Sequence, residues 1–158
     1  MQRKTLFIIT ISLLSIIFIA ARIFYTSQQS LVTAKDQAIE MIKDKVQFKS
    51  ISDFYWYNTD KTYYSLAGVD QNDQAIYAIV SPETKELVTL VQDQVVNEED
   101  ARSITVQDKA PLKVLSARLG MIGEEPVWEV NYQMTSKAMG YYYISAKTGK
   151  WIKDIENI

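Results

Sequence analysis

The side chains that could carry chemistry in this chain are carboxylates, hydroxyls and lysines, because its 158 residues include no histidine and no cysteine. Without histidine, the usual general base and the common partner of a nucleophilic serine are missing. Two serines have a lysine nearby, Ser81 with Lys85 and Ser145 with Lys147. Both pairs are expected at strand–turn junctions, whereas Ser-x-x-Lys catalysis needs its serine at the start of a helix. We therefore expect no catalytic residue and no enzymatic activity.

The carboxylates do not form a recognisable metal or cofactor motif. The segment from Asp70 to Asp73 offers too few carboxylates for a calcium loop, and thiolate and imidazole ligands are missing. We expect no metal, no cofactor and no small-molecule substrate. Hydrolysis of wall glycan stays as a weaker alternative, and it needs two carboxylates about 5 to 9.5 Å apart across one cleft.

Tyrosines are the most conspicuous candidates for binding, with ten in the chain. By strand alternation, Tyr55, Tyr57, Tyr141 and Tyr143 are expected on the sheet face opposite the core. Tyrosines on an uncovered face would offer a protein partner a large contact area with a polar tip. Packing of two parts of the chain against each other would instead hide the same residues, and both interpretations stay open.

An apolar segment near the start predicts a membrane anchor. Residues 6–21 (LFIITISLLSIIFIAA) carry no charge and follow Arg3 and Lys4, as expected for a helix that spans the bilayer. A cleaved signal peptide is the alternative, but cleavage after Ala21 would place the bulky Ile19 where a small residue is needed. The basic residues before the span predict a cytoplasmic N-terminus and extracellular C-terminal domains on a single-pass protein of the cell membrane.

Within the span, Ser12 and Ser15 lie three residues apart and share one helical face. Small polar residues at this spacing let another membrane helix approach closely. Serine is also simply tolerated in lipid, because its hydroxyl can bond to the preceding turn of the helix. At the far end, Arg22 and Tyr25 suit the headgroup region.

The charge of the remaining chain argues against nucleic acid as a partner. Apart from Arg3, Lys4 and Arg22, 14 basic residues stand against 19 acidic ones, a net charge of about −5. No basic stripe is present, so we expect no nucleic-acid binding.

The part after the anchor repeats itself at an offset of 64 residues. The segment YAIVSPETKELV (77–88) aligns without gaps onto YYYISAKTGKWI (141–152), and tyrosine, serine and threonine match at equivalent positions. Each segment is predicted to form a strand, a turn and a second strand.

A helix is predicted before the strands of each copy. Residues 34–45 have an apolar face, and Thr33 with Asp36 resembles a capping box. In the second copy, Asn97 and the acids after it favour a helix start, and Pro111 ends that helix near Lys109.

The predicted strands give an α+β fold, with a transmembrane helix followed by two tandem helix-plus-antiparallel-sheet units. We expect an anchor at 1–26, a first unit at 27–94 and a second at 95–158. The short linker 92–96 lacks glycine, which predicts that the units pack together as a fairly rigid pair. The strands are expected at residues 51–57, 63–69, 75–80 and 86–91, then 112–121, 127–134, 139–145 and 151–155.

The second copy carries PVWEVNYQ (126–133) and GYYYISAKTGK (140–150), and these residues resemble bacterial PepSY-type domains. The resemblance implies that the helix-plus-sheet units are of PepSY or cystatin-like type. The arrangement of the whole chain is similar to the TseB-like (YpmB) family of Gram-positive bacteria. The first copy matches only by its layout, because it lacks the Trp-Glu-Val signature.

The resemblance implies a non-enzymatic cell-surface regulator that binds a penicillin-binding transpeptidase and modulates cell wall elongation. Inhibition or chaperoning of an extracellular protease is the alternative, since PepSY-type domains also occur in protease propeptides.

Overall fold

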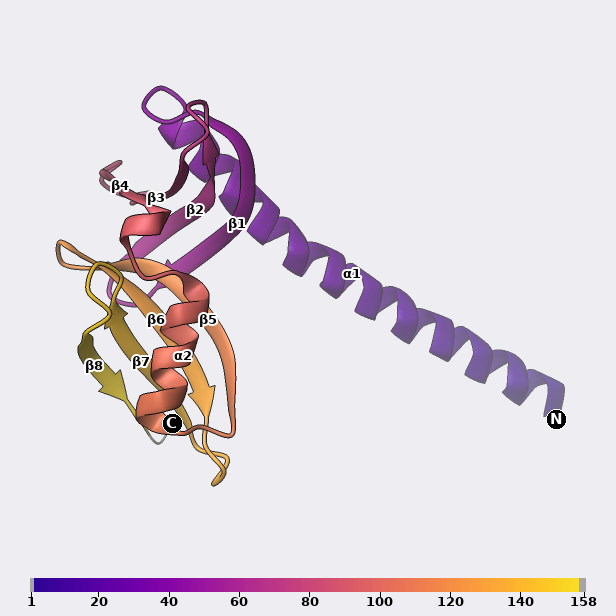
Figure 1. The fold of residues 1–158 in the computed structure, drawn as a ribbon. Coiled ribbons are helices and arrows are strands. Elements are labelled where there is room, and N and C mark those ends of the chain that lie inside the picture. The colour runs from indigo at the N-terminus through magenta and orange to yellow at the C-terminus, as the bar shows by residue number, and fades with distance from the viewer. Residues whose placement is uncertain (1, 157–158) are drawn as a thin grey trace. The chain divides into compact units, whose positions relative to one another are not determined.

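The computed structural model describes the backbone of residues 2–156 and the side chains of residues 7–24 and 29–156. The chain forms two compact units, Met1–Asp36 and Gln37–Ile158, and each is described by itself. The elements are α1 (Gln2–Ile42), β1 (Phe48–Asn58), β2 (Thr62–Asp70), β3 (Ala75–Val80), β4 (Leu87–Val91), the 3-10 helix η1 (Gln92–Gln94), α2 (Glu98–Lys109), β5 (Lys113–Ile122), β6 (Glu125–Gln133), β7 (Met139–Ser145) and β8 (Trp151–Ile155). Figure 1 labels all of them except η1.

The first helix continues beyond the predicted membrane span. α1 runs without a break from Gln2 to Ile42, so the helix expected over residues 34–45 is present up to Ile42, and Ala38 and Ile42 of its apolar face are buried. Its expected start, with a capping box at Thr33 and Asp36, is wrong. Residues 22–36 contain neither glycine nor proline, and nothing in this segment interrupts the ladder of helical hydrogen bonds.

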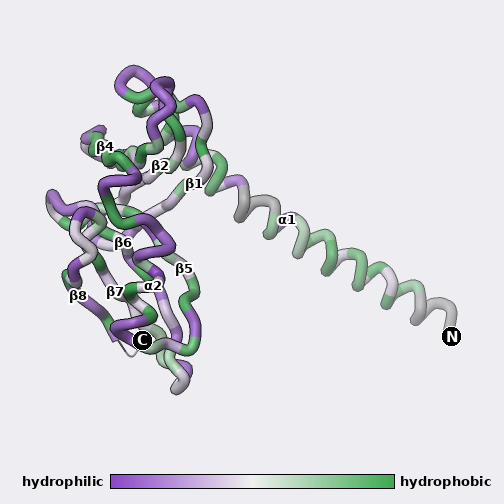
Figure 2. Tube along the Cα trace, in the orientation of Figure 1, coloured by the Kyte–Doolittle hydropathy of each residue, from purple (hydrophilic) through white to green (hydrophobic). Residues whose placement is uncertain are grey.

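α1 has the length and composition of a membrane anchor. Its stretch Phe7–Ile42 includes a window with a mean hydropathy of 2.5, and the side chains of residues 7–24 are all exposed. Figure 2 shows the apolar character of this part of the helix. The predicted roles of Arg3, Lys4 and Tyr25 concern side chains outside the described ones.

Two antiparallel sheets make up most of the Gln37–Ile158 unit. The first has the strand order β1-β2-β3-β4 and the second the order β5-β6-β7-β8, and α2 packs on β5 and β6 (Figure 1). The α+β fold with an N-terminal apolar helix and two sheet units is therefore confirmed.

α2 is the helix that the sequence predicts after the linker. The Asn97 side chain accepts a hydrogen bond from the N–H of Asp100 at 2.9 Å, and the helix ends at Lys109. Ala101 and Thr105 are fully buried. The apolar face and the N-terminal cap thus agree with the expected ones.

The predicted tight packing of the two copies is also confirmed, because one apolar core extends over both sheets and α2. It has buried members from the first sheet, from α2 and from the second sheet, among them Tyr77, Ile79, Ala101, Leu119, Trp128, Tyr142 and Ile144.

The repeated serines shape two matching turns. The Ser81 hydroxyl accepts from the N–H of Thr84 at 3.2 Å, and that of Ser145 accepts from Thr148 at 3.1 Å. The main-chain hydrogen bonds also match. The N–H of Lys85 donates to the carbonyl of Ser81, and the N–H of Gly149 donates to the carbonyl of Ser145, both at 2.9 Å. These contacts give both serines a structural role.

Lys85 and Gly149 hold the same turn position with positive φ angles of 61° and 71°. A side chain is strained in this region and glycine is not. We expect Lys85→Gly to raise the free energy of unfolding by about 0.5 kcal/mol and Gly149→Ala to lower it by about 1 kcal/mol. Urea unfolding of a fragment of residues 29–158 measures both changes in the free energy of unfolding, and the two changes should have opposite signs. Equal effects of the two changes would contradict the shared geometry.

Candidate functional site

The two sheets meet around Trp128, whose side chain is fully buried. The rings of Tyr55 and Tyr77 from the first sheet contact it edge-on, with centroid distances of 5.2 and 5.8 Å. The indole N–H donates to the carbonyl of Val96 in the linker at 2.7 Å. A single side chain of the second sheet therefore contacts both the first sheet and the linker.

Polar contacts close the same interface. The Tyr55 hydroxyl donates to Glu98 at the start of α2 at 2.8 Å, and buried Ser65 donates to the carbonyl of Leu119 at 2.8 Å. Burial and, next, the hydrogen bond to Glu98 raise the pKa of Tyr55 above its ordinary value. Tyr55 thus stays neutral and serves as a fixed donor across the interface.

Two of the four candidate tyrosines are fully buried in the interface. Tyr57 and Tyr143 are only 1% and 2% exposed, and they pack in one cluster with Val127. For these two residues, packing of the repeats against each other is therefore the correct interpretation, and an uncovered face is wrong. Tyr141 and Tyr143 lie on the sheet face opposite Tyr142. The first repeat covers that face. Partner binding by Tyr55 and Tyr141, which are half-buried, stays a prediction.

The fit between the repeats leaves no spare volume at one point. A Cβ atom at Gly120 would lie 2.2 Å from Cγ of Tyr57, far inside contact distance. Glycine is therefore required in β5 so that the ring from β1 can lie against the second sheet. Burial raises the pKa of Tyr57 to about 12.

Glu129 is the polar centre of the covered face. Its carboxyl group is almost fully buried and accepts hydrogen bonds from Tyr143 at 2.9 Å and from Thr59 at 3.1 Å. Arg118 lies 3.4 Å from the other carboxyl oxygen. Three segments distant in the sequence converge on this one side chain, which makes it a structural rather than an acid–base group.

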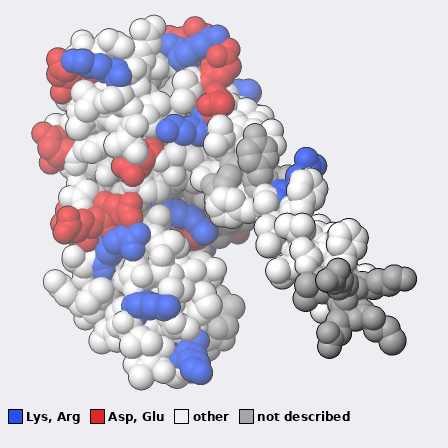
Figure 3. Space-filling model, turned by 90° about the vertical axis from the view of Figure 1, so that its right-hand side faces the viewer, with Lys and Arg blue, Asp and Glu red and all other residues white. Residues whose placement is uncertain are grey.

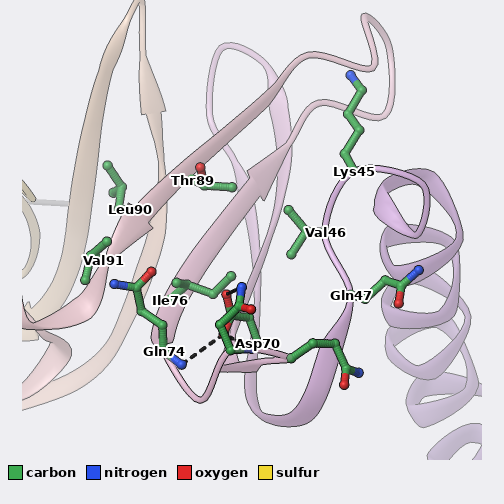
Figure 4. Close-up of a pocket in the computed structure, with 11 residues that line it drawn as sticks. Lys45, Val46, Gln47, Asp70, Gln74, Ile76, Thr89, Leu90 and Val91 are labelled. Atoms are coloured by element: carbon green, nitrogen blue, oxygen red, sulfur yellow. Dashed lines mark hydrogen bonds between the residues drawn. The ribbon is translucent and has the colours of Figure 1, made fainter.

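An open groove of about 340 Å³ lies on the first repeat. Its walls come from the α1–β1 connection, the β2–β3 hairpin and the edge strand β4, as Figure 4 shows. Val46, Ile76 and Val91 provide apolar surface, and the rim is polar. The hairpin at the rim is well fixed, because Asp70 accepts from the N–H groups of Asn72 and Gln74.

Those two hydrogen bonds, the one from Gln74 first, lower the pKa of the Asp70 carboxyl group. The volume is within the usual range of ligand pockets, but the open, mixed lining suits a protein segment better than an enclosed small molecule.

The candidate residues of the membrane helix lie apart from this unit in sequence. Ser12 and Ser15 are both exposed, and the Ser15 hydroxyl donates to the carbonyl of Ile11 at 2.9 Å. The hydroxyl of Ser15 is therefore satisfied within the helix, and packing of either serine against another membrane helix stays a prediction.

Sequence reasoning missed both Glu129 and the groove. Glu129 alternates with the apolar Trp128 and Val130, and this pattern is typical of a strand with one solvated face. The covering residue, Tyr57, comes from the other repeat. For the groove, a usable signal was the strand LVTLV (87–91), which has no charged residue although it ends a sheet.

Comparison with known proteins gives two matches along the chain. Residues 37–81 match the model of the cell wall elongation regulator TseB-like domain. Residues 95–155 match the model of the peptidase propeptide and YPEB domain, PepSY. The resemblance to TseB-like and PepSY domains is therefore confirmed, and the TseB-like match falls on the repeat that the sequence matched only by its layout. No curated protein matches the chain.

Two solved structures are similar to the chain to different degrees. The chain is similar to the YpmB protein from Bacillus subtilis, with a TM-score of 0.69 and 21% identity over 77% of this chain and 95% of that one. The YpeB C-terminal domain from Bacillus megaterium gives a TM-score of 0.36 and 16% identity, over 81% of this chain and 65% of that one. The likeness to YpmB shows a shared fold.

Removing the Glu129 carboxyl group should weaken the joint between the repeats. Glu129→Ala leaves the hydroxyls of Tyr143 and Thr59 without their acceptor, and we expect a loss of about 2 kcal/mol in the free energy of unfolding. Glu129→Gln keeps one acceptor oxygen, and its loss in the free energy of unfolding should be clearly smaller. Urea unfolding compares the two, and equal losses would show that the hydrogen bonds to this side chain are not what matters.

Proposed function

We propose that the protein is a membrane-anchored, non-enzymatic regulator that binds a penicillin-binding transpeptidase outside the cell and modulates cell wall elongation. The match of residues 37–81 to the cell wall elongation regulator TseB-like domain carries this proposal. The matched segment contains the end of α1, β1, β2 and β3, and hence most of the groove.

The anchor supports this function by mass action. A protein held by α1 at the outer surface of the membrane meets other membrane-tethered proteins at a high effective concentration. Even a modest affinity then gives substantial occupancy, so regulation needs docking and no turnover.

The shared core supports a mechanism of rigid docking. Because the two repeats pack as one body, a partner that binds the groove of the first repeat also has the second repeat held in a fixed place beside it. The surface of this body carries groups of both signs, as the face in Figure 3 shows. Mixed charge of this kind suits a protein partner rather than a polyanion.

A second candidate function is the inhibition or chaperoning of an extracellular protease. The match of residues 95–155 to a domain described by its occurrence in peptidase propeptides supports it. Under this hypothesis the purified extracellular part slows a protease at a near-equimolar ratio.

Capture from membranes tests the first function. The full-length protein, carrying an affinity tag, is purified from detergent-solubilised membranes whose transpeptidases are labelled with a fluorescent penicillin. We expect a labelled band with the wild type and about tenfold less with Val46→Arg, which places a charge in the groove wall.

Val106→Arg is the matched control, because Val106 is half exposed on α2 and lies outside the groove. Recovery with this variant should equal that of the wild type. Absence of a labelled band with the wild type, or equal recovery by the α1 segment alone, would contradict transpeptidase docking through the extracellular part.

A further inference from the structure

The edge strand β4 differs from the other edges of the two sheets. β1, β5 and β8 each have a shift in register, and each contains charged residues. β4 pairs with β3 without a shift and consists of LVTLV, with no charge and no proline. Natural proteins usually protect sheet edges with bulges, charges or proline. β4 therefore has the features of an edge that receives another strand.

The outward backbone groups of β4 can be identified from the ladder. The N–H of Ser81 donates to the carbonyl of Glu86 at 3.1 Å, and bonded pairs alternate along antiparallel strands. Glu86 is therefore a bonded residue, and every second residue after it, Val88 and then Leu90, also bonds to β3. The N–H and C=O groups that point away from β3 belong to Leu87, Thr89 and Val91. Within the described part of the chain, no other strand pairs with this side of β4.

We propose that β4 pairs antiparallel with β4 of a second copy of this chain, with the two-fold axis at Thr89. In this register, Thr89 faces Thr89 of the second copy, and Leu87 faces Val91 of the second copy. The outward N–H and C=O groups of one β4 strand then meet the outward groups of the other. Threonine pairs and apolar pairs are favourable across antiparallel strands. The result is a continuous eight-stranded sheet built from two first repeats.

Charges at the ends of the strand favour the same register. Lys85 and Asp93 lie four residues to either side of Thr89, Lys85 in the turn before β4 and Asp93 in η1 after it. The two-fold axis therefore brings the basic end of one strand next to the acidic end of the other. Both residues are exposed. The contact occurs twice by symmetry, and charge complementarity thus selects a second copy over an uncharged extended peptide.

The groove described above lies on one face of this sheet and includes Thr89 and Val91 in its wall (Figure 4). In the paired sheet, the grooves of both copies lie on the same face. Leu87 of the second copy is then next to Val91, at the border of the groove. Pairing therefore extends the groove and does not depend on which partner the groove binds.

A five-residue edge forms a small interface, which by size is a weak and transient one. Confinement by α1 to a membrane raises the effective concentration of the two copies and makes such pairing effective there. The pairing is therefore tested in membranes with the full chain.

The absence of native cysteine allows a direct test by disulfide crosslinking. Thr89→Cys places two cysteines about 5.5 Å apart between Cα atoms, within the range of a disulfide. Leu87→Cys is the matched control on the same strand, because its two copies lie roughly 13 Å apart in this register. We expect copper-phenanthroline to give a disulfide-linked homodimer severalfold more with Thr89→Cys than with Leu87→Cys.

A mixture of Leu87→Cys and Val91→Cys chains should again crosslink. In the Thr89→Cys background, Lys85→Glu should lower the dimer yield about threefold, and adding Asp93→Lys should restore it. Equal yields from Thr89→Cys and Leu87→Cys, no dimer with either, or adducts of Thr89→Cys with other proteins only would overturn the proposal.

Discussion

The burial of Trp128 between two tyrosines of the first repeat is the contact on which the rest of the structure depends. Large aromatic rings contribute both apolar area and edge-to-face contacts, and here the rings come from both sheets. The indole N–H also fixes the linker through Val96. Without this contact, each sheet would keep an uncovered aromatic face, and the chain would be two small domains on a helix.

The joint between the repeats determines which surfaces remain for partners. The buried tyrosines Tyr57 and Tyr143 stabilise the interface, and Glu129 accepts hydrogen bonds from the hydroxyls of Tyr143 and Thr59. The interface thereby covers Tyr57 and Tyr143, and neither is available to a partner. The groove of the first repeat and the edge of β4 stay open, and most of the groove lies on the residues that match the TseB-like domain. A regulator of this design presents one rigid surface rather than two independent ones.

Local patterns in the sequence were enough to predict most of the elements. The cap at Asn97, the end of α2 at Lys109 and the repeated serine turns depend on neighbours within four residues, and the structure has them as expected. The continuous α1 was missed because the capping pattern at Thr33 is equally compatible with a helix interior when no glycine or proline precedes it.

The site was harder to predict, because it depends on contacts between residues far apart in sequence. Alternation placed Tyr143 on the correct face of its strand, but no local pattern says that Tyr57 covers that face. The small residue at Gly120, which admits the Tyr57 ring, is informative only once the two strands are known to meet. The groove likewise arises from three segments that only the folded chain brings together.

Native-state hydrogen exchange tests the central claim that the two repeats are one cooperative body. In the fragment of residues 29–158, the most protected amides of β2 and β3 should open with the same free energy as those of β6 and β7, because unfolding either sheet exposes the shared core. A difference between the sheets of more than about 2 kcal/mol would show that the repeats unfold independently, and would contradict the account.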